Sequence, residues 1–211
     1  CDLLVIGGGP AGLMAALTAG RADANVILVD EDSRFGGRLN VEQEDIDGKP
    51  AFEWVEQAVA ELTEMDNVRL MPRSTAMGAF DHGVYGVVER VQDHLHTPVE
   101  GKPRQTFWRV YSKGAILCAG ATERPIVFPD NDRPGVMLAG SMRTYANRWA
   151  ATPARMVAIF TNNDDGHRTA VDLIAKGVDV TAIVDSRLDA PTLTDVRLIS
   201  GAHVIGTKGR H

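Results

Sequence analysis

Apolar runs that end at glycine or at acidic residues recur along the chain and predict strands that alternate with helices. Residues 2–6 are typical of a strand buried on both faces of a parallel sheet, and Pro10 suits the first turn of a following helix. A second apolar run, 25–29, ends at Asp30. Strand, glycine turn, helix and strand in this order predict a compact βαβ unit over residues 2–31.

The pattern changes twice before residue 120. Apolar residues at i, i+3, i+7 and i+10 predict a helix that covers a sheet; they are Phe52, Val55, Val59 and Leu62. Between about residues 66 and 112 the apolar pieces are short, and runs such as 68–70 and 108–110 predict a small antiparallel meander. Residues 114–118 predict another buried strand, which ends in small residues.

A second strand–turn–helix–strand pattern begins near residue 151, with strands over 156–160 and 178–184 and a helix to about residue 176. We therefore predict an α/β fold of the Rossmann-like, FAD/NAD(P)-binding type with two dinucleotide-binding domains, a parallel sheet and the small antiparallel meander. The first domain would span residues 1–150 and the second, degenerate and truncated, residues 151–211. Because the chain opens in a strand and stops just after an apolar run, 202–205, read as another strand, we expect a piece of a longer polypeptide.

Composition excludes several classes of function. The chain has 211 residues, of which 44% are hydrophobic and 24% charged, as in an ordinary soluble globular protein. A net charge of −6 argues against nucleic-acid binding. No apolar run reaches membrane-spanning length and no signal peptide is present, so we expect no membrane association and a cytoplasmic location.

Candidate catalytic and metal-binding residues are few. The two cysteines, Cys1 and Cys118, are too far apart in sequence for a close-spaced redox pair. His94 and His96 lie in a polar loop that offers neither a cysteine nor a close pair of carboxylates to complete a metal site. We therefore predict a binding site, with no catalytic residue and no metal ligand in this stretch of sequence.

The sequence GGGPAG at residues 7–12 carries the binding prediction. Gly7, Gly9 and Gly12 follow a strand with the spacing of the dinucleotide fingerprint, and Asp30 comes about 20 residues later. Gly7 allows a tight turn, Gly9 lets the backbone approach a pyrophosphate, and Gly12 lets the helix pack closely on the strand. The pyrophosphate would meet the N–H groups and the positive dipole end of the helix.

The acids after the second strand predict which dinucleotide is held. Asp30 can accept hydrogen bonds from both hydroxyl groups of the adenosine ribose. Glu31 and Asp32 beside it would repel a 2′-phosphate, so NAD or FAD is favoured over NADP.

Two further segments are candidates for the same site, each with a structural alternative. Gly36-Gly37-Arg38 lies where the loop can return to the pyrophosphate, with Arg38 as a bidentate cation, or it forms an exposed turn. Ala119 and Gly120 permit close approach of a cofactor or an ordinary tight turn. The predicted cofactor-binding residues are Gly7, Gly9, Pro10, Ala11, Gly12, Asp30, Glu31, Gly37, Arg38, Ala119 and Gly120.

The corresponding turn of the second unit departs from this pattern. It has Thr161 and Asn163 before Gly166, and Asp164 and Asp165 open the helix. Two carboxylates at a helix N-terminus stabilise the helix but repel a phosphate. We predict nucleotide architecture without a bound nucleotide in this unit.

Five longer strings are informative when taken together: GGGPAGLMAALTAGR, DEDSRFGGRL, FDHGVYGVVERVQDH, ATERPIVFPDNDRPGVMLAG and TNNDDGHRTA. Together they resemble the α subunit of heterotetrameric sarcosine oxidase. The first is widespread among FAD and NAD enzymes, whereas VFPDNDRPGVMLAG and TNNDDGHRTA are much narrower. The resemblance runs from end to end of the chain but covers only the nucleotide-binding region of that large subunit.

The resemblance implies an oxidoreductase complex that oxidatively demethylates sarcosine to glycine, forms hydrogen peroxide and passes the one-carbon unit to tetrahydrofolate as methylene-tetrahydrofolate. It implies β, γ and δ partner subunits, NAD in this chain, FAD on the β subunit and FMN between α and β. A folate-binding domain would lie beyond residue 211. On this chain the NAD would sit on Gly7, Gly9 and Gly12, with Asp30 on the ribose and Gly37, Arg38 and Gly120 nearby.

Other functions stay open at this point. Similar α subunits serve opine, proline and cyanide-forming amine oxidations. A reductase with FAD at the first turn and NADH at the second is an alternative of another class, although the acids at the second turn disfavour NADH there. A third hypothesis is a non-catalytic scaffold that is stabilised by a bound nucleotide.

Overall fold

The computed structural model describes residues 1–208, which form two compact units. The first comprises Cys1–Asn40 and Glu44–Ala121, and the second Val41–Gln43 and the chain from Thr122 onward. The division at Ala121 differs from the boundary expected near residue 150. Met142 and Ala146, on helical segments of the stretch between these positions, are buried in one hydrophobic cluster with Ile159 and Leu173, which explains the difference.

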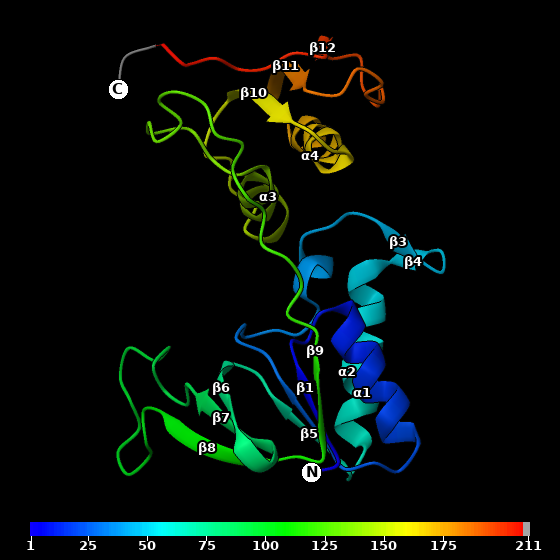
Figure 1. Ribbon diagram of the computed structural model, residues 1–211, viewed down its shortest axis with the longest axis vertical. Coiled ribbons are helices and arrows are strands. Elements are labelled where there is room, and N and C mark those ends of the chain that lie inside the picture. The colour runs from blue at the N-terminus through cyan, green and yellow to red at the C-terminus, as the bar shows by residue number, and fades with distance from the viewer. Residues whose placement is uncertain (209–211) are drawn as a thin grey trace. The chain divides into compact units, whose positions relative to one another are not determined.

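The first unit is built on a four-stranded parallel sheet of β1 (Leu3–Ile6), β2 (Val26–Val29), β5 (Val68–Met71) and β9 (Gly114–Leu117), in the order β5-β2-β1-β9. The helices α1 (Pro10–Arg21) and α2 (Ala51–Glu64) cover one face, and the meander covers the other (Figure 1). Alternate residues of β1 serve the two faces, since Val5 packs in the helix-side cluster and Leu4 in the meander-side cluster. The predicted βαβ unit is confirmed.

The meander consists of β6 (Ser74–Phe80), β7 (Val84–Glu89) and β8 (Thr106–Tyr111), paired antiparallel in that order. Its existence is confirmed, but the assignment of residues 68–70 to it is wrong. This run is part of β5, where Leu28 of β2 is paired with Leu70 in parallel register. A three-residue apolar run does not distinguish a buried parallel strand from a meander strand.

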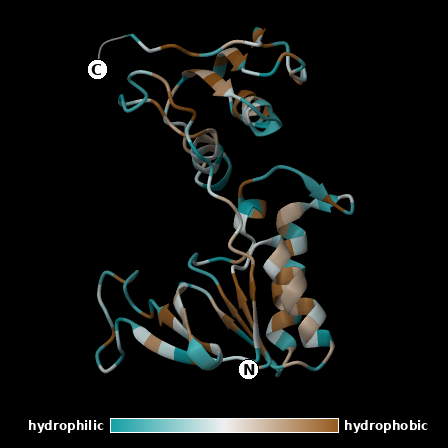
Figure 2. Ribbon diagram, in the orientation of Figure 1, coloured by the Kyte–Doolittle hydropathy of each residue, from teal (hydrophilic) through white to brown (hydrophobic). Residues whose placement is uncertain are grey.

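Two burial predictions in this unit are also wrong. Phe52 is 53% exposed at the start of α2, while Val55 and Leu62 of the same stripe are buried. Ile116 and Leu117 of β9 are 41% and 75% exposed, because β9 is an edge strand of the sheet. Figure 2 shows the apolar strands at the centre of the unit, beside helices that are apolar along one side.

The second unit has a three-stranded parallel sheet of β10 (Met156–Thr161), β11 (Asp179–Asp185) and β12 (Leu198–Ser200). Helix α4 (Asp164–Ala175) joins β10 to β11, as predicted. The strand expected over residues 202–205 lies instead at β12, and α3 (Ala139–Arg143) leads into a π-helical turn, η3 (Thr144–Arg148).

Short elements complete the secondary structure. They are η1 (Gly37–Asn40), β3 (Asp45–Ile46), β4 (Lys49–Pro50) and η2 (Asp81–Gly83). Of the helices within residues 1–208, none is long and apolar enough to cross a membrane.

Candidate dinucleotide-binding site

The glycine turn joins β1 to α1 at the carboxyl edge of the parallel sheet. Gly7 has φ +102°, and its N–H donates to Val29 O at 2.8 Å. A Cβ on Gly7 would lie 2.4 Å from Cys118 O, so both the conformation and the packing require glycine. The turn is therefore bound closely to the ends of both neighbouring strands.

Gly12 and Gly9 differ in how much space surrounds the position that a Cβ atom would occupy. A Cβ on Gly12 would lie 1.8 Å from Gly7 O, so Gly12 is needed for the close packing of helix on strand. A Cβ on Gly9 would meet nothing nearer than Gly37 Cα at 3.9 Å, and Gly9 has an ordinary φ of −71°. Neither the conformation nor the packing of this chain therefore requires glycine at Gly9. The space beside it is open to a ligand.

The start of α1 is suited to an anion. Gly9 is the N-cap, Pro10 is at the first helical position, and Ala11 is exposed. In the described chain no side chain caps this helix, and its first turn holds no acidic residue. N–H groups and the helix dipole at such an end attract a phosphate.

Asp30 lies at the end of β2 against the glycine turn. Its Oδ2 accepts a hydrogen bond from Gly8 N at 2.5 Å, and its Oδ1 accepts one from Asp32 N at 2.7 Å. The carboxylate is thereby fixed beside the turn, and each oxygen keeps a lone pair for a further donor. Glu31 is exposed, and its carbonyl accepts a hydrogen bond from Arg90.

The loop after β2 returns to the glycine turn, where it was expected. Gly36 N donates to Gly8 O at 2.7 Å, and a Cβ on Gly37 would lie 3.0 Å from Gly9 Cα. Arg38 is exposed in η1. Phe35 was not among the predicted site residues. It is 7% exposed and lies so close to Gly8 that a Cβ on Gly8 would be 2.3 Å from the Phe35 ring. The sequence feature that could have identified Phe35 is an aromatic residue directly before two glycines.

Ala119 and Gly120 follow β9 and are exposed. The strand pairs with β1, and Cys118 N donates to Ile6 O at 2.7 Å, so these residues leave the sheet at the same edge as Gly7. Gly120 has φ +68°. The structure thus brings the predicted residues of all three segments to one edge of the sheet, and their roles toward a cofactor stay predictions.

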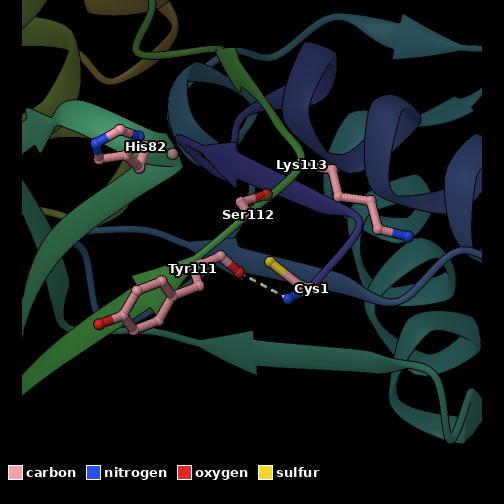
Figure 3. A pocket seen from close by; sticks show the side chains of 6 residues that line it. Cys1, His82, Tyr111, Ser112 and Lys113 are labelled. Atoms are coloured by element: carbon pink, nitrogen blue, oxygen red, sulfur yellow. Dashed lines mark hydrogen bonds between the residues drawn. The ribbon is translucent and has the colours of Figure 1, made fainter.

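A pocket lined by Cys1, His82, Gly83, Tyr111, Ser112 and Lys113 lies elsewhere (Figure 3). It opens at the amino ends of β1 and β9, whereas ligands of open parallel sheets bind at the carboxyl ends. No group of three potential metal-ligating side chains occurs within residues 1–208.

Comparison with known proteins identifies relatives of the chain. Residues 2–90 match the family described as FAD dependent oxidoreductase. The chain is 53% identical to sarcosine oxidase subunit alpha of Rhizobium meliloti (strain 1021), over 99% of this chain and 21% of that protein. It is 38% identical to sarcosine oxidase subunit alpha of Corynebacterium sp. (strain P-1), over 98% of this chain and 22% of that protein.

The chain is similar to sarcosine oxidase α subunits along nearly its whole length. It spans about a fifth of the length of these relatives. Among solved structures, L-proline dehydrogenase from P. horikoshii matches with a TM-score of 0.73 and 25% identity, over 99% of this chain and 37% of that one. The Rossmann-like fold and the resemblance to sarcosine oxidase α subunits are confirmed. The family match supports a flavoprotein-type fold, and both α-subunit names imply multisubunit enzymes.

Proposed function

We propose that this chain is the dinucleotide-binding region of the α subunit of a sarcosine-oxidising complex, with NAD held at Gly7, Gly9 and Gly12. The open space beside Gly9 carries the proposal. A packing turn needs Gly7 and Gly12 but leaves Gly9 unexplained, whereas a pyrophosphate needs the backbone bare at that position. The uncapped start of α1 supports the same ligand.

The residues around the turn fit an adenine dinucleotide. Asp30 is fixed at the strand end where a carboxylate can accept the ribose hydroxyl groups, and Arg38 belongs to the loop beside Gly9. A bound dinucleotide would supply adenosine and pyrophosphate contacts that stabilise this unit by mass action. Ala119 and Gly120 leave the sheet at the same edge and would approach it without bulky side chains.

The reaction belongs to the whole complex in this proposal. That complex oxidatively demethylates sarcosine to glycine, forms hydrogen peroxide and transfers the one-carbon unit to tetrahydrofolate; FAD, FMN and the β, γ and δ subunits complete it. Identities of 53% and 38% to two sarcosine oxidase α subunits support sarcosine over proline as the substrate, since the likeness to the proline dehydrogenase has 25% identity. This chain would hold the nucleotide and contribute no catalytic side chain.

Mass spectrometry of the small molecules released by denaturing the purified chain, with visible absorbance, tests the cofactor. We expect NAD at about one per chain and no flavin absorbance. Stoichiometric FAD would overturn the assignment of NAD to the first turn and would favour the reductase that binds FAD there and NADH at the second turn. An opine-type complex would leave the NAD result unchanged, and oxygen uptake by the complete complex with sarcosine, proline or an opine separates these substrates.

Gly9→Asp is the matched test of the site itself. Its φ of −71° and the open space accept a side chain, and aspartate is a favoured N-cap, so the variant should fold at least as stably as the parent chain. Its carboxylate would occupy the pyrophosphate position and repel it, so we expect at least about a hundredfold weaker NAD binding, or about 2.7 kcal/mol. Unchanged NAD affinity would contradict the placement at Gly9.

A further inference from the structure

The second unit repeats the βαβ geometry of the first, and its corresponding positions hold different side chains. Gly166 packs on β10 as Gly12 packs on the first turn, since a Cβ there would lie 2.4 Å from the Thr161 side chain. Asp185 ends β11, the strand that follows the helix, as Asp30 follows β2. The close helix–strand packing of a nucleotide-binding unit is therefore retained.

Two N–H groups at the start of α4 have hydrogen-bond partners within the chain. Asn163 is the N-cap, and its Oδ1 accepts a hydrogen bond from Asp165 N at 3.0 Å. Thr161 Oγ1 accepts one from Asn163 N at 3.2 Å. Two groups that would bind a phosphate in the first unit are thus occupied, and α4 has a side-chain cap where α1 has none.

Arg187 joins the two places between which a nucleotide would lie. Its Nη1 donates to Asp164 Oδ1 at 2.8 Å, at the first position of α4. Its Nη2 donates to Asp185 Oδ2 at 2.9 Å and its Nε to Asp185 Oδ1 at 3.2 Å, at the end of β11. The guanidinium therefore connects the pyrophosphate position at the helix with the ribose-binding acid at the strand.

Asp185 is fully engaged by this chain. It is 0% exposed, and Arg187 N donates to its Oδ1 at 2.8 Å. His167, 1% exposed on α4, lies with Nε2 2.8 Å from Asp185 Oδ2. Burial alone would raise the pKa of Asp185, but hydrogen bonds from the Arg187 side chain and backbone and from His167 lower it to about 2. The carboxylate thus has less capacity for ribose hydroxyl groups than Asp30.

We propose that Arg187 is a specificity-determining residue that closes the second unit to nucleotides. With Asp164, Asp185 and His167 it takes the place of the ribose and pyrophosphate of a dinucleotide. The positively charged Arg187 guanidinium also holds the start of α4 and the end of β11 together, as a bound ligand otherwise would. The unit then folds without cofactor, and the chain holds at most one dinucleotide whatever occupies the first turn.

Equilibrium dialysis with radiolabelled NADH at millimolar concentration tests this on the whole 211-residue chain. In the parent chain we count all bound nucleotide, that is, the NAD released by denaturation together with the bound NADH. We expect no more than about one nucleotide per chain, and about two per chain would overturn the proposal. A parent chain that holds no nucleotide at all would contradict the function proposed for the first turn, without bearing on Arg187.

The second arm removes the guanidinium. Arg187→Ala should lower the thermal midpoint by about 5 °C or more, and low-millimolar guanidinium chloride should restore it saturably against a sodium chloride control. Arg21→Ala, at the exposed ion pair with Glu61, is the matched control and should show neither effect. Arg187→Lys, which cannot bridge both carboxylates as a fork, should fall between parent and alanine variant. A parent-like midpoint in Arg187→Ala would overturn the proposal.

Discussion

Gly12 packs directly on the carbonyl of Gly7, so closely that a Cβ at Gly12 would lie 1.8 Å from Gly7 O. This contact places the start of α1 over the end of β1 and thereby forms the site. The obstructing atom belongs to the backbone of the turn, which cannot rotate away as a flexible side chain could. The geometry of the site and the stability of the first unit therefore depend on the same contact.

Gly12→Ala should destabilise the first unit by at least about 2 kcal/mol, because overpacking against fixed backbone forces the helix away from the strand. Urea denaturation followed by circular dichroism measures the change in free energy of unfolding. Gly114→Ala is the control, since nothing lies within 4 Å of a Cβ at that strand position. Equal stability of the two variants would show that the turn relaxes without cost.

Asp30 should set the preference for NAD over NADP. Its carboxylate is held beside the turn by Gly8 N and Asp32 N, and a 2′-phosphate there would meet a fixed negative charge. We expect the parent chain to bind NAD at least about tenfold more tightly than NADP, or 1.4 kcal/mol. Asp30→Asn should reduce this ratio, measured by calorimetric titration. A ratio unaffected by Asp30→Asn would remove that residue from the ribose site.

The βαβ units and the glycine turn could be predicted because their signals are local. Each needs an apolar run, a glycine spacing and an acid within about 30 residues. The role of residues 68–70 could not be predicted in this way. Whether a short apolar run pairs with β2 or with the meander depends on contacts between residues distant in sequence. The exposure of Leu117 likewise follows from its place on an edge strand. The hydrophobic pattern of a strand does not predict the position of that strand in the sheet.

The second unit shows the same division between local and distant information. Acidic residues at 164 and 165 predicted that its turn would repel phosphate. The bridging role of Arg187 could not be predicted from the sequence. Its contact with Asp164 spans 23 residues, and in the sequence an arginine after a strand looks the same as any surface arginine. Phe35 was overlooked for a similar reason, since its packing on Gly8 joins two loops.

Arg143 should be a strong determinant of stability in the second unit. Its side chain is 4% exposed, and Nε lies 2.8 Å from Asp172 Oδ2, which also accepts from Asn147 Nδ2 at 2.9 Å. Arg143→Met would leave the Asp172 carboxylate buried without its cation and should cost about 3–5 kcal/mol. Thermal and urea unfolding measure this loss. The double variant Arg143→Met/Asp172→Leu should regain much of it, and a double variant as unstable as the single one would assign the loss to packing instead.

Asp185 should make the second unit sensitive to acid. Its pKa is lowered to about 2 in the folded chain, so its contribution is complete above the unfolded-state pKa near 4 and is lost as the pH falls toward 2. The groups that face it are Arg187, His167 and, through Arg187, Asp164. Asp185→Asn should therefore be less stable than the parent by about 2 kcal/mol at pH 6, a difference that disappears near pH 2. Urea midpoints of both chains from pH 2 to 7 measure it, with Asp179→Asn, an exposed acid at the other end of β11, as the control. A difference that stayed constant across this range would mean that Asp185 acts through its shape and hydrogen bonds rather than through its charge.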